Sequence, residues 1–270
     1  YNFPMVASAA SSEQIWQRGY KNTFGVDVPA ANYMDIAIAV AQERGAKTFQ
    51  LISSDTPFST DVAIGVREEL ARRDLSLVLD EVYNLDQTDF SGLAKKLLDN
   101  DADVLLGATY LEDAVGIRDA IQAMPTGIDR DMVALTVGPA TFEFGGAMGE
   151  QAEGIVGVVQ WLRSVHKPGA QDFAYRYRQR YGNNPGVHGA IGYSTGQILE
   201  AAVRLAEGID KDAVREQLKS MQIHTLFGEY KVDETGRQIG KKNFLLQWQD
   251  GRRRLVAPSN VADRELKYPR

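Results

Sequence analysis

The side chains that most often catalyse reactions or bind metals are few in this chain and are not arranged for either role. The three histidines, His166, His188 and His224, do not have the spacing of metal ligands. The absence of cysteine excludes thiolate nucleophiles, Cys-ligated metals and disulfides. The stretch Gly192–Gly196 reads Gly-Tyr-Ser-Thr-Gly, but it lies within a helical pattern and not in the strand-to-helix turn that a nucleophile elbow requires. There is also no glycine-rich phosphate or dinucleotide motif, so we expect no enzyme, no cofactor and no metal.

The overall charge argues against nucleic acid as a partner. The chain has 270 residues, with 30 Lys plus Arg, 36 Asp plus Glu and a net charge of −6. Phosphate contacts need a basic surface, and the only basic cluster, residues 252–254, is interpreted as a solvated turn. No apolar run approaches the roughly 18 residues of a membrane-spanning helix. We therefore expect neither nucleic-acid binding nor direct membrane insertion.

Strand and helix patterns alternate along the first half of the chain. Expected strands are 48–53, 75–82, 103–107 and 132–137, and expected helices are 32–43, 59–71 (with Ser59 as its N-cap), 90–98, 112–123 and 142–148. This order predicts parallel βαβ units with helices on both faces of the sheet. Such a sheet binds its ligand at the carboxyl ends of its strands. The loops at 53–59, 108–112 and 138–143 are therefore the candidate ligand loops.

The second half and the start of the chain follow a different pattern. A strand is expected at 154–161, followed by helices at 170–181, 190–207 and 211–221 and by a β-rich tail with a hairpin turn at 250–251. The segment 5–12 reads as a strand end and a loop with no preceding partner strand. We interpret this start as entering a domain whose first part lies upstream of the segment.

Six short motifs occur in a fixed order over nearly the whole chain. They are Pro4-Met5 with Gln17-Arg18-Gly19-Tyr20, Asp55-Thr56-Pro57-Phe58-Ser59, Tyr83 with Thr88-Asp89-Phe90-Ser91, Asp103 with Tyr110 and Glu112, Gly138-Pro139, and Phe227-Gly228 with Asp233-Glu234-Thr235-Gly236. In this order they resemble the type I periplasmic binding proteins. Within these, they resemble the branched-chain amino acid and amide receptors of ABC transporters, the Leu/Ile/Val-binding protein family.

This resemblance implies an α/β fold with two hinged, Rossmann-like lobes, each a mainly parallel sheet flanked by helices. Lobe one would comprise 1–25 and 139–225 and would lack its N-terminal part, and lobe two would comprise 26–138 and 226–270. The lobes would be joined near 24–26, 137–141 and 225–228. They would close around the ligand by hinge motion.

The resemblance also implies which residues bind the ligand. In lobe one, the small-residue loop of Ala9, Ala10 and Ser11 would hold a carboxylate or an amide, with small side chains exposing backbone N–H groups and the hydroxyl adding a donor. In lobe two, the rings of Phe58 and Tyr110 would close over the ligand. Without the resemblance, the loop could simply cap the following helix, and the two rings could be core packing.

One position departs from the family pattern. Amino-acid receptors of the family usually carry an acid directly after Gly-Pro, where this chain has Ala140 after Gly138. Because a desolvated ammonium without a counter-charge is costly, we expect a carboxylate or amide ligand with an apolar or aromatic body and no amine. Glu143 could compensate by turning inward, or it could lie on a solvated helix face. Trp161 could line the ligand crevice, or it could be buried with its indole N–H satisfied.

The function implied by the resemblance is capture of a small molecule outside the cytoplasm. The chain would be a periplasmic solute-binding protein that delivers an amino acid, amide or aromatic acid to a membrane ABC permease. The alternative is the ligand-binding sensor domain of a receptor with the same fold. A transcription regulator on this fold would carry a basic DNA-binding helix pair, and none is present.

Overall fold

The chain is divided between two units, and each unit is assembled from segments that are far apart in the sequence. A computed structural model describes residues 2–125, 130–165 and 167–269. Unit 1 comprises Tyr1–Pro29 and Gln160–Asn243, and unit 2 comprises Ala30–Val159 and Phe244–Arg270. The chain therefore passes between the units after Pro29, after Val159 and after Asn243.

Unit 2 is built on one mixed sheet with strand order β11-β10-β7-β6-β5-β3-β4. The strands are β3 (Thr48–Ser54), β4 (Ser76–Tyr83), β5 (Val104–Ala108), β6 (Met132–Leu135), β7 (Val156–Val159), β10 (Phe244–Gln249) and β11 (Arg252–Ala257). Strands β3 to β7 are parallel, whereas β10 pairs antiparallel with both β7 and β11. The second parallel strand, β4, lies outside the first, β3, while β5, β6 and β7 extend the sheet in the other direction. The strand order of this sheet therefore reverses direction between β3 and β5, as it does in doubly wound folds.

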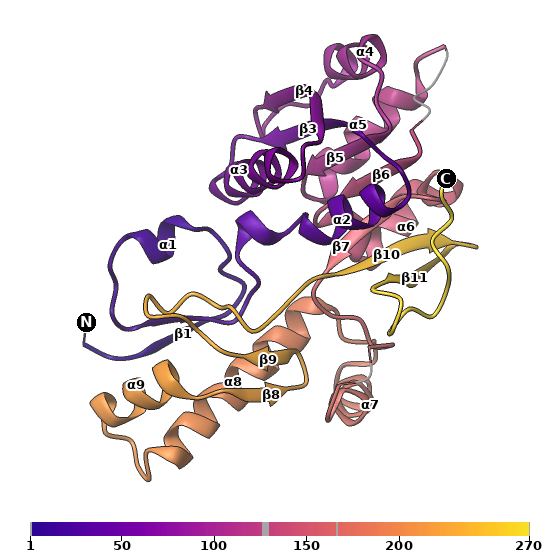
Figure 1. Ribbon diagram of the computed structural model, residues 1–270. Coiled ribbons are helices and arrows are strands. Elements are labelled where there is room, and N and C mark those ends of the chain that lie inside the picture. Colours follow the sequence, from indigo (N-terminus) through magenta and orange to yellow (C-terminus); the bar gives the residue numbers. More distant parts are fainter. Residues whose placement is uncertain (1, 126–129, 166, 270) are drawn as a thin grey trace. The chain divides into compact units, whose positions relative to one another are not determined.

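Helices cover both faces of this sheet. Unit 2 contains η1 (Ala30–Asn32), α2 (Asp35–Glu43), α3 (Pro57–Arg72), α4 (Ser91–Asp99), α5 (Leu111–Gln122), η2 (Gly138–Ala140), α6 (Phe142–Met148) and η3 (Gly149–Ala152). Residues of α2 and α3 share a core with Phe49 and Leu51 of β3 (Figure 1). Gln50, which points to the opposite face, donates to the Leu97 carbonyl of α4 at 2.9 Å. The predicted α/β fold, with a mainly parallel sheet and flanking helices, is confirmed.

The start of α3 corrects one expectation. Its N-cap is Thr56, whose hydroxyl accepts from the Ser59 amide at 3.2 Å, and not Ser59 itself. Pro57 follows as the first helical residue, where its missing N–H costs nothing. Ser59 is fully buried, and its hydroxyl accepts from the Ser54 hydroxyl at 2.8 Å.

Unit 1 combines short strands with longer helices. It contains β1 (Met5–Ala7), α1 (Gln14–Gln17), β2 (Thr23–Gly25), α7 (Ala170–Tyr181), α8 (Val187–Leu205), α9 (Lys211–Ser220), β8 (Ile223–Thr225) and β9 (Gly228–Tyr230). Strands β1 and β2 pair in parallel, and β8 and β9 form an antiparallel pair beside α8 (Figure 1). The core joins Phe24 of β2 to Phe173 of α7, Ile191 of α8 and Tyr230 of β9. In the described ranges, no helix combines the length and the apolar character needed to cross a bilayer.

The unit boundaries differ from those expected from the sequence. Residues 139–159 belong to unit 2, because β7 pairs with β6 and β10. Residues 226–243 belong to unit 1, because the fully buried Tyr230 lies in its core and donates from its hydroxyl to the Leu218 carbonyl at 2.6 Å. The connecting points consequently lie later in the chain than the expected 24–26, 137–141 and 225–228.

Candidate functional site

Three aromatic rings meet at the carboxyl edge of the sheet in unit 2. Phe58 lies in the first turn of α3, directly after β3, and Tyr110 follows β5. Because β3 and β5 are parallel neighbours, their loops emerge at the same edge, and the two ring centroids are 6.0 Å apart. The Tyr33 ring packs edge-on against the Phe58 ring, with the two ring centroids 5.3 Å apart. All three rings are half-buried. We call Tyr33, Phe58 and Tyr110 the aromatic edge; the sequence had indicated the last two but not Tyr33.

The backbone of Tyr110 is held by a buried carboxylate. The Tyr110 amide donates to Asp113 Oδ1 at 2.6 Å, and the Tyr83 hydroxyl donates to Asp113 Oδ2 at 2.5 Å. Burial raises the pKa of Asp113, although these hydrogen bonds act in the opposite direction. Burial and the neighbouring Asp113 also raise the pKa of Tyr83. Asp113 therefore serves to position the start of α5 and is already occupied by donors from the protein.

A small cavity adjoins Tyr110 within unit 2. Its volume is about 350 Å³, and its lining consists of Leu85, Asp86, Gln87, Thr88, Phe90, Tyr110, Glu112, Asp113 and Gly116. A Cβ at Gly116 would lie 2.9 Å from the Phe90 ring, so glycine at this position allows the ring to pack closely against α5. Tyr110 thus belongs both to the aromatic edge and to the wall of this cavity.

A cation from β11 binds the backbone of the loop after β6. The Arg253 guanidinium of β11 donates to the Ala140 carbonyl and lies over the Phe142 ring, 3.7 Å from its centroid. Glu143 is exposed, and its charge attracts Arg253. Glu143 therefore lies on a solvated face, as the second interpretation had it. Within unit 2, the backbone after Gly-Pro is bound to a positive group.

Gly138 is buried where this loop meets α5. A Cβ at this position would lie 3.1 Å from both the Tyr110 carbonyl oxygen and Ala114 Cβ. Glycine therefore allows the loop to pack against the start of α5, next to the aromatic edge. A direct contact of Gly138 with ligand stays a prediction.

In unit 1, the segment Ala9–Ser11 forms a polar loop after β1. Ala9 is exposed and has a left-handed backbone, with φ of 52°, a conformation that non-glycine residues adopt mainly where the structure imposes it. Ala10 and Ser11 are half-buried, and the Ser11 hydroxyl donates to Asp27 Oδ2 at 3.0 Å. Within the described residues, the N-cap of α1 is Glu13, which makes no side-chain capping bond. The Ser11 hydroxyl therefore ties this loop to Asp27.

Asp27 is attracted by a half-buried lysine, Lys241, that the sequence did not single out. Burial raises the pKa of Asp27, while hydrogen bonds from Ser11 and Gln160 and the charge of Lys241 act in the opposite direction. Burial lowers the pKa of Lys241 to about 7, and the charge of Asp27 opposes that shift. The Lys241 ammonium donates to the Val26 carbonyl at 2.6 Å. No local sequence signal links Asp27 with Lys241, because nearly the whole chain separates them.

Trp161 has the contacts of a core residue, which was the alternative interpretation. Only 3% of it is exposed, its indole N–H donates to the Leu226 carbonyl at 3.0 Å, and its ring packs against Phe173. His188 is exposed, and His166 lies outside the described residues. The Gly-Tyr-Ser-Thr-Gly stretch lies inside α8, where Ser194 is fully buried, so it does not form a nucleophile elbow.

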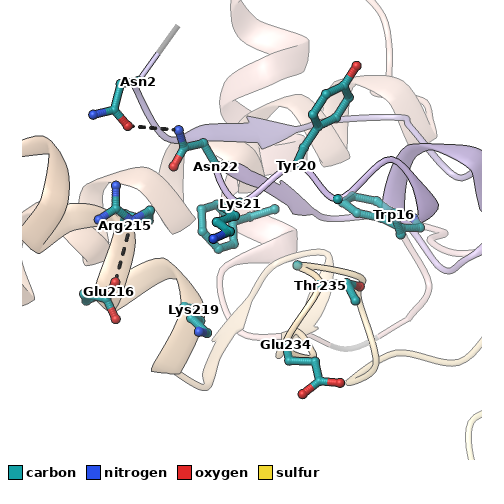
Figure 2. A pocket seen from close by; sticks show the side chains of 13 residues that line it. Asn2, Trp16, Tyr20, Lys21, Asn22, Arg215, Glu216, Lys219, Glu234 and Thr235 are labelled. Atoms are coloured by element: carbon teal, nitrogen blue, oxygen red, sulfur yellow. Dashed lines mark hydrogen bonds and ion pairs between the residues drawn. The ribbon is translucent and has the colours of Figure 1, made fainter.

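Unit 1 also contains a cavity of about 620 Å³ that the sequence did not indicate. Figure 2 shows Arg215 and Lys219 of α9 on one side of it and Trp16 on the other. Trp16 is 7% exposed, and in the described part of the chain its indole N–H has no hydrogen-bond partner. Arg215 pairs with Asp212 at 2.7 Å, and Glu216 and Glu234 also line the cavity. With both signs of charge in its lining, this cavity favours neither an anion nor a cation.

The model of the family described as periplasmic binding protein matches residues 2–253. The chain belongs to this family. It is a family of binding proteins and not of enzymes, and the extracytoplasmic location that its description implies agrees with the expectation from the sequence.

Known relatives of this binding protein are distant in sequence and close in fold. Leu/Ile/Val-binding protein homolog 7 of Brucella suis biovar 1 is 24% identical over an alignment of 283 residues, gaps included. The alignment covers 98% of this chain and 71% of the relative. A crystal structure described as a branched-chain amino acid ABC transporter from Silicibacter pomeroyi has a TM-score of 0.87 at 17% identity and covers 99% of this chain and 76% of its own. A solute binding protein of an ABC transporter from R. palustris, in complex with benzoate, has a TM-score of 0.79 at 14% identity, with coverage of 99% and 72%. At these identities the two structures show a shared fold. That the first part of a domain lies upstream of the segment 5–12 stays a prediction.

Proposed function

We propose that this chain is an extracytoplasmic solute-binding protein that binds a small organic carboxylate or amide with an aromatic or apolar body. The polar loop of unit 1 would bind the carboxylate or amide group, and the aromatic edge of unit 2 would bind the body. The chain would release its ligand to the permease of an ABC transporter. Membership of the periplasmic binding protein family supports this proposal.

The observation that carries the proposal is the aromatic edge at the switch in strand order. Open α/β sheets bind ligands outside the carboxyl ends of their strands at this position. Phe58 and Tyr110 emerge from the two strands that flank the switch, and both rings are half-buried and not enclosed in the core. Aromatic rings supply a large contact area and favour offset or edge-on packing with another ring. An aromatic carboxylate fits this surface well.

The surroundings of Ala140 favour a ligand without an amine. A buried ammonium needs a counter-charge, and the backbone at Ala140 is bound to the Arg253 cation. Benzoate, the ligand of the R. palustris neighbour, has a carboxylate and a ring but no amine. The name of the Brucella relative points instead to branched-chain amino acids. L-leucine is therefore the ligand to compare with benzoate.

The first experiment is calorimetric titration of the protein with benzoate and with L-leucine. We expect benzoate to bind more tightly. Tyr110→Ala should weaken benzoate binding by about 30-fold or more, because aromatic anchors in binding surfaces commonly contribute this much. Tyr175→Ala is the matched control, since Tyr175 is 65% exposed on α7 of unit 1. Unchanged benzoate affinity in Tyr110→Ala, with the folded protein intact by circular dichroism, would remove Tyr110 from the site.

A second variant tests the ligand class in the opposite direction. Ala140→Asp introduces an acid directly after Gly-Pro, where amino-acid receptors of this family usually carry one. We expect it to weaken benzoate binding through charge repulsion and to strengthen L-leucine binding through its ammonium. Equal changes for the two ligands would show that this position does not select between them.

Hinge closure is part of the same proposal. A ligand that binds the closed state more tightly shifts the population toward it. Small-angle X-ray scattering should then show a smaller radius of gyration with saturating benzoate than without it. An unchanged radius, with binding established by calorimetry, would contradict closure but not ligand capture.

A further inference from the structure

The three segments that connect the units are tied to one another where they leave unit 1. The first connection leaves after Pro29, the second enters at Gln160 and the third leaves after Asn243. The Val28 amide of the first donates to Gln160 Oε1 of the second at 2.9 Å, in a buried hydrogen bond across 132 residues. The Lys241 ammonium of the third donates to the Val26 carbonyl of the first at 2.6 Å. Side chains therefore join the second and third connections to the backbone of the first.

Asp27 lies at the centre of these contacts. Its carboxylate accepts from the Ser11 hydroxyl at 3.0 Å, and the charge of Lys241 and the Gln160 side chain both act to lower its pKa. A half-buried carboxylate is stabilised by hydrogen bonds and by the attraction of a positive charge, and Asp27 has the hydrogen bond from Ser11 and the attraction of Lys241. Asp27 thus links the three connections to the polar loop, in which Ser11 is a predicted ligand contact.

We propose that Asp27, Gln160 and Lys241 form a connecting clasp that fastens the three connections together in unit 1 and couples them to Ser11. The clasp removes Val26 to Val28 from the flexible part of the first connection, so bending is confined to residues beyond it. In a hinge motion, a few residues absorb the change in backbone angles. Residues that are held in place cannot be among them, so the clasp determines where the hinge begins. A change in the hydrogen bonding of Ser11 then reaches all three connections through Asp27.

The immediate surroundings suit a fixed clasp. Val26 is fully buried, Val28 is 2% exposed and Gln160 is 4% exposed, so water does not compete for the hydrogen bonds among them. The Lys241 ammonium lies 4.5 Å from the centroid of the Phe227 ring, in a cation–π contact. Two further titratable side chains face the clasp: Lys167, which repels Lys241, and His188, whose protonated form would attract Asp27.

Amide hydrogen exchange in the ligand-free protein tests the clasp directly. Gln160→Ala should speed exchange of the Val28 amide by about tenfold, the size of effect expected for one lost hydrogen bond. Ser11→Ala, which removes no bond to Val28, should speed the same amide by about threefold or more through Asp27 and Gln160. Gln171→Ala is the matched control, because Gln171 is an exposed glutamine of unit 1 that donates to the Arg163 carbonyl. Val28 exchange within about twofold of wild type in Ser11→Ala would overturn the coupling.

Lys241 is tested by conservative rescue. Lys241→Met keeps the length of the side chain but removes the ammonium, and it should speed exchange of the amides around Val26. Lys241→Arg keeps a cation that can donate to the Val26 carbonyl, and it should restore most of the protection. Lys219→Met, at an exposed lysine of α9, is the control. Equal exchange in the Met and Arg variants would show that the ammonium does not hold the connection.

The role of the clasp in binding rests on the proposed function and needs a ligand. Benzoate affinity should be measured for Ser11→Ala, Gln160→Ala and the double variant. We expect the double variant to lose about threefold less affinity than the product of the two single losses, because both substitutions interrupt one path. Multiplicative losses would overturn this role. If the wild type binds neither benzoate nor L-leucine, the proposed ligand class is wrong. The amide-exchange data then decide by themselves whether the clasp holds the connections together.

Discussion

The aromatic edge of unit 2 and the polar loop of unit 1 are built in different ways. Phe58 and Tyr110 of the aromatic edge follow the parallel strands β3 and β5, and one sheet brings their rings together. Ser11 of the polar loop donates to Asp27, whose neighbours Val26 and Val28 are bound by Lys241 and Gln160 from distant parts of the chain. The first arrangement depends on a repeated local pattern, and the second depends on the closure of a discontinuous unit.

This difference predicts whether a substitution in each region lowers stability alone or also weakens ligand binding. Damage to the sheet of unit 2 should act through stability, because the aromatic side chains are attached directly to its strands and helices. Damage to a distant contact in unit 1 should also release the polar loop and weaken ligand binding. The predictions below compare matched substitutions in the two units.

The largest effect is expected at two glycines that approach backbone carbonyls. A Cβ at Gly236 of unit 1 would lie 2.0 Å from the Thr23 oxygen, at a φ of 87°, and a Cβ at Gly65 of unit 2 would lie 1.8 Å from the Ala31 oxygen. We expect Gly236→Ala and Gly65→Ala each to lower the free energy of unfolding by about 3 kcal/mol, from overpacking and backbone strain. Urea unfolding measures the loss.

The two glycine variants should differ in which backbone amides lose protection from hydrogen exchange. The Gly25 amide donates to the Gly236 carbonyl at 2.8 Å, so Gly236→Ala should also speed amide exchange at Gly25, close to the clasp. Gly65→Ala should leave that amide unchanged. Gly92→Ala is the control, because no atom lies within 4 Å of the added Cβ, and it should be neutral or slightly stabilising. Faster exchange at Gly25 in both variants would contradict independent construction of the two regions.

A smaller difference is expected between two arginines. In unit 1, Arg237 binds Glu13 through two hydrogen bonds of 2.8 and 2.9 Å, which join the tail of that unit to the residues after the polar loop. In unit 2, Arg73 shares Glu69 with Arg72 on the same helix. We expect Arg237→Met to cost about 2 kcal/mol of unfolding free energy, and Arg73→Met less than about 1 kcal/mol because Arg72 remains as a partner. Only Arg237→Met should weaken benzoate binding, and equal binding losses would contradict the comparison.

The pH dependence of stability should also distinguish Lys241 of unit 1. Because burial lowers its pKa from 10.5 to about 7, the unfolded chain holds a proton on Lys241 that the folded chain lacks between these values. This group therefore makes the free energy of unfolding rise with pH across that window. Lys241→Met should lack this rise relative to wild type in urea unfolding at pH values on either side of the window. The same pH dependence in both proteins would show that the Lys241 pKa is not lowered.

Many helices of both units, and the carboxyl edge of unit 2, could be predicted from sequence because their signals are local. The helix of residues 170–181 and that of 142–148 were predicted with the observed bounds, since capping and periodicity act within a few residues. Phe58 and Tyr110 were found because a residue directly after a strand must lie at the carboxyl edge. Tyr33 was missed because it precedes α2 and reaches the aromatic edge only through folding of the unit.

The unit boundaries and the clasp could not be read from local patterns. Strand β7 looks the same in sequence whether it begins a lobe or completes a sheet, and only its pairing with β6 and β10 assigns it to unit 2. Likewise, an isolated Asp27 and an isolated Lys241 are ordinary surface residues by composition. Their meeting depends on the closure of unit 1 around segments from both ends of the chain.

The sequence by itself determined the α/β fold, the family and the loops at the carboxyl edge, because these depend on periodicity and on short ordered motifs. The tertiary structure decided which strands flank the switch in order, which rings touch and which charges lie together. Those features depend on free energies that arise only when distant segments exclude water from one another. A hydrogen bond such as that from Val28 to Gln160 has no counterpart in the unfolded chain, and local sequence patterns therefore do not reveal it.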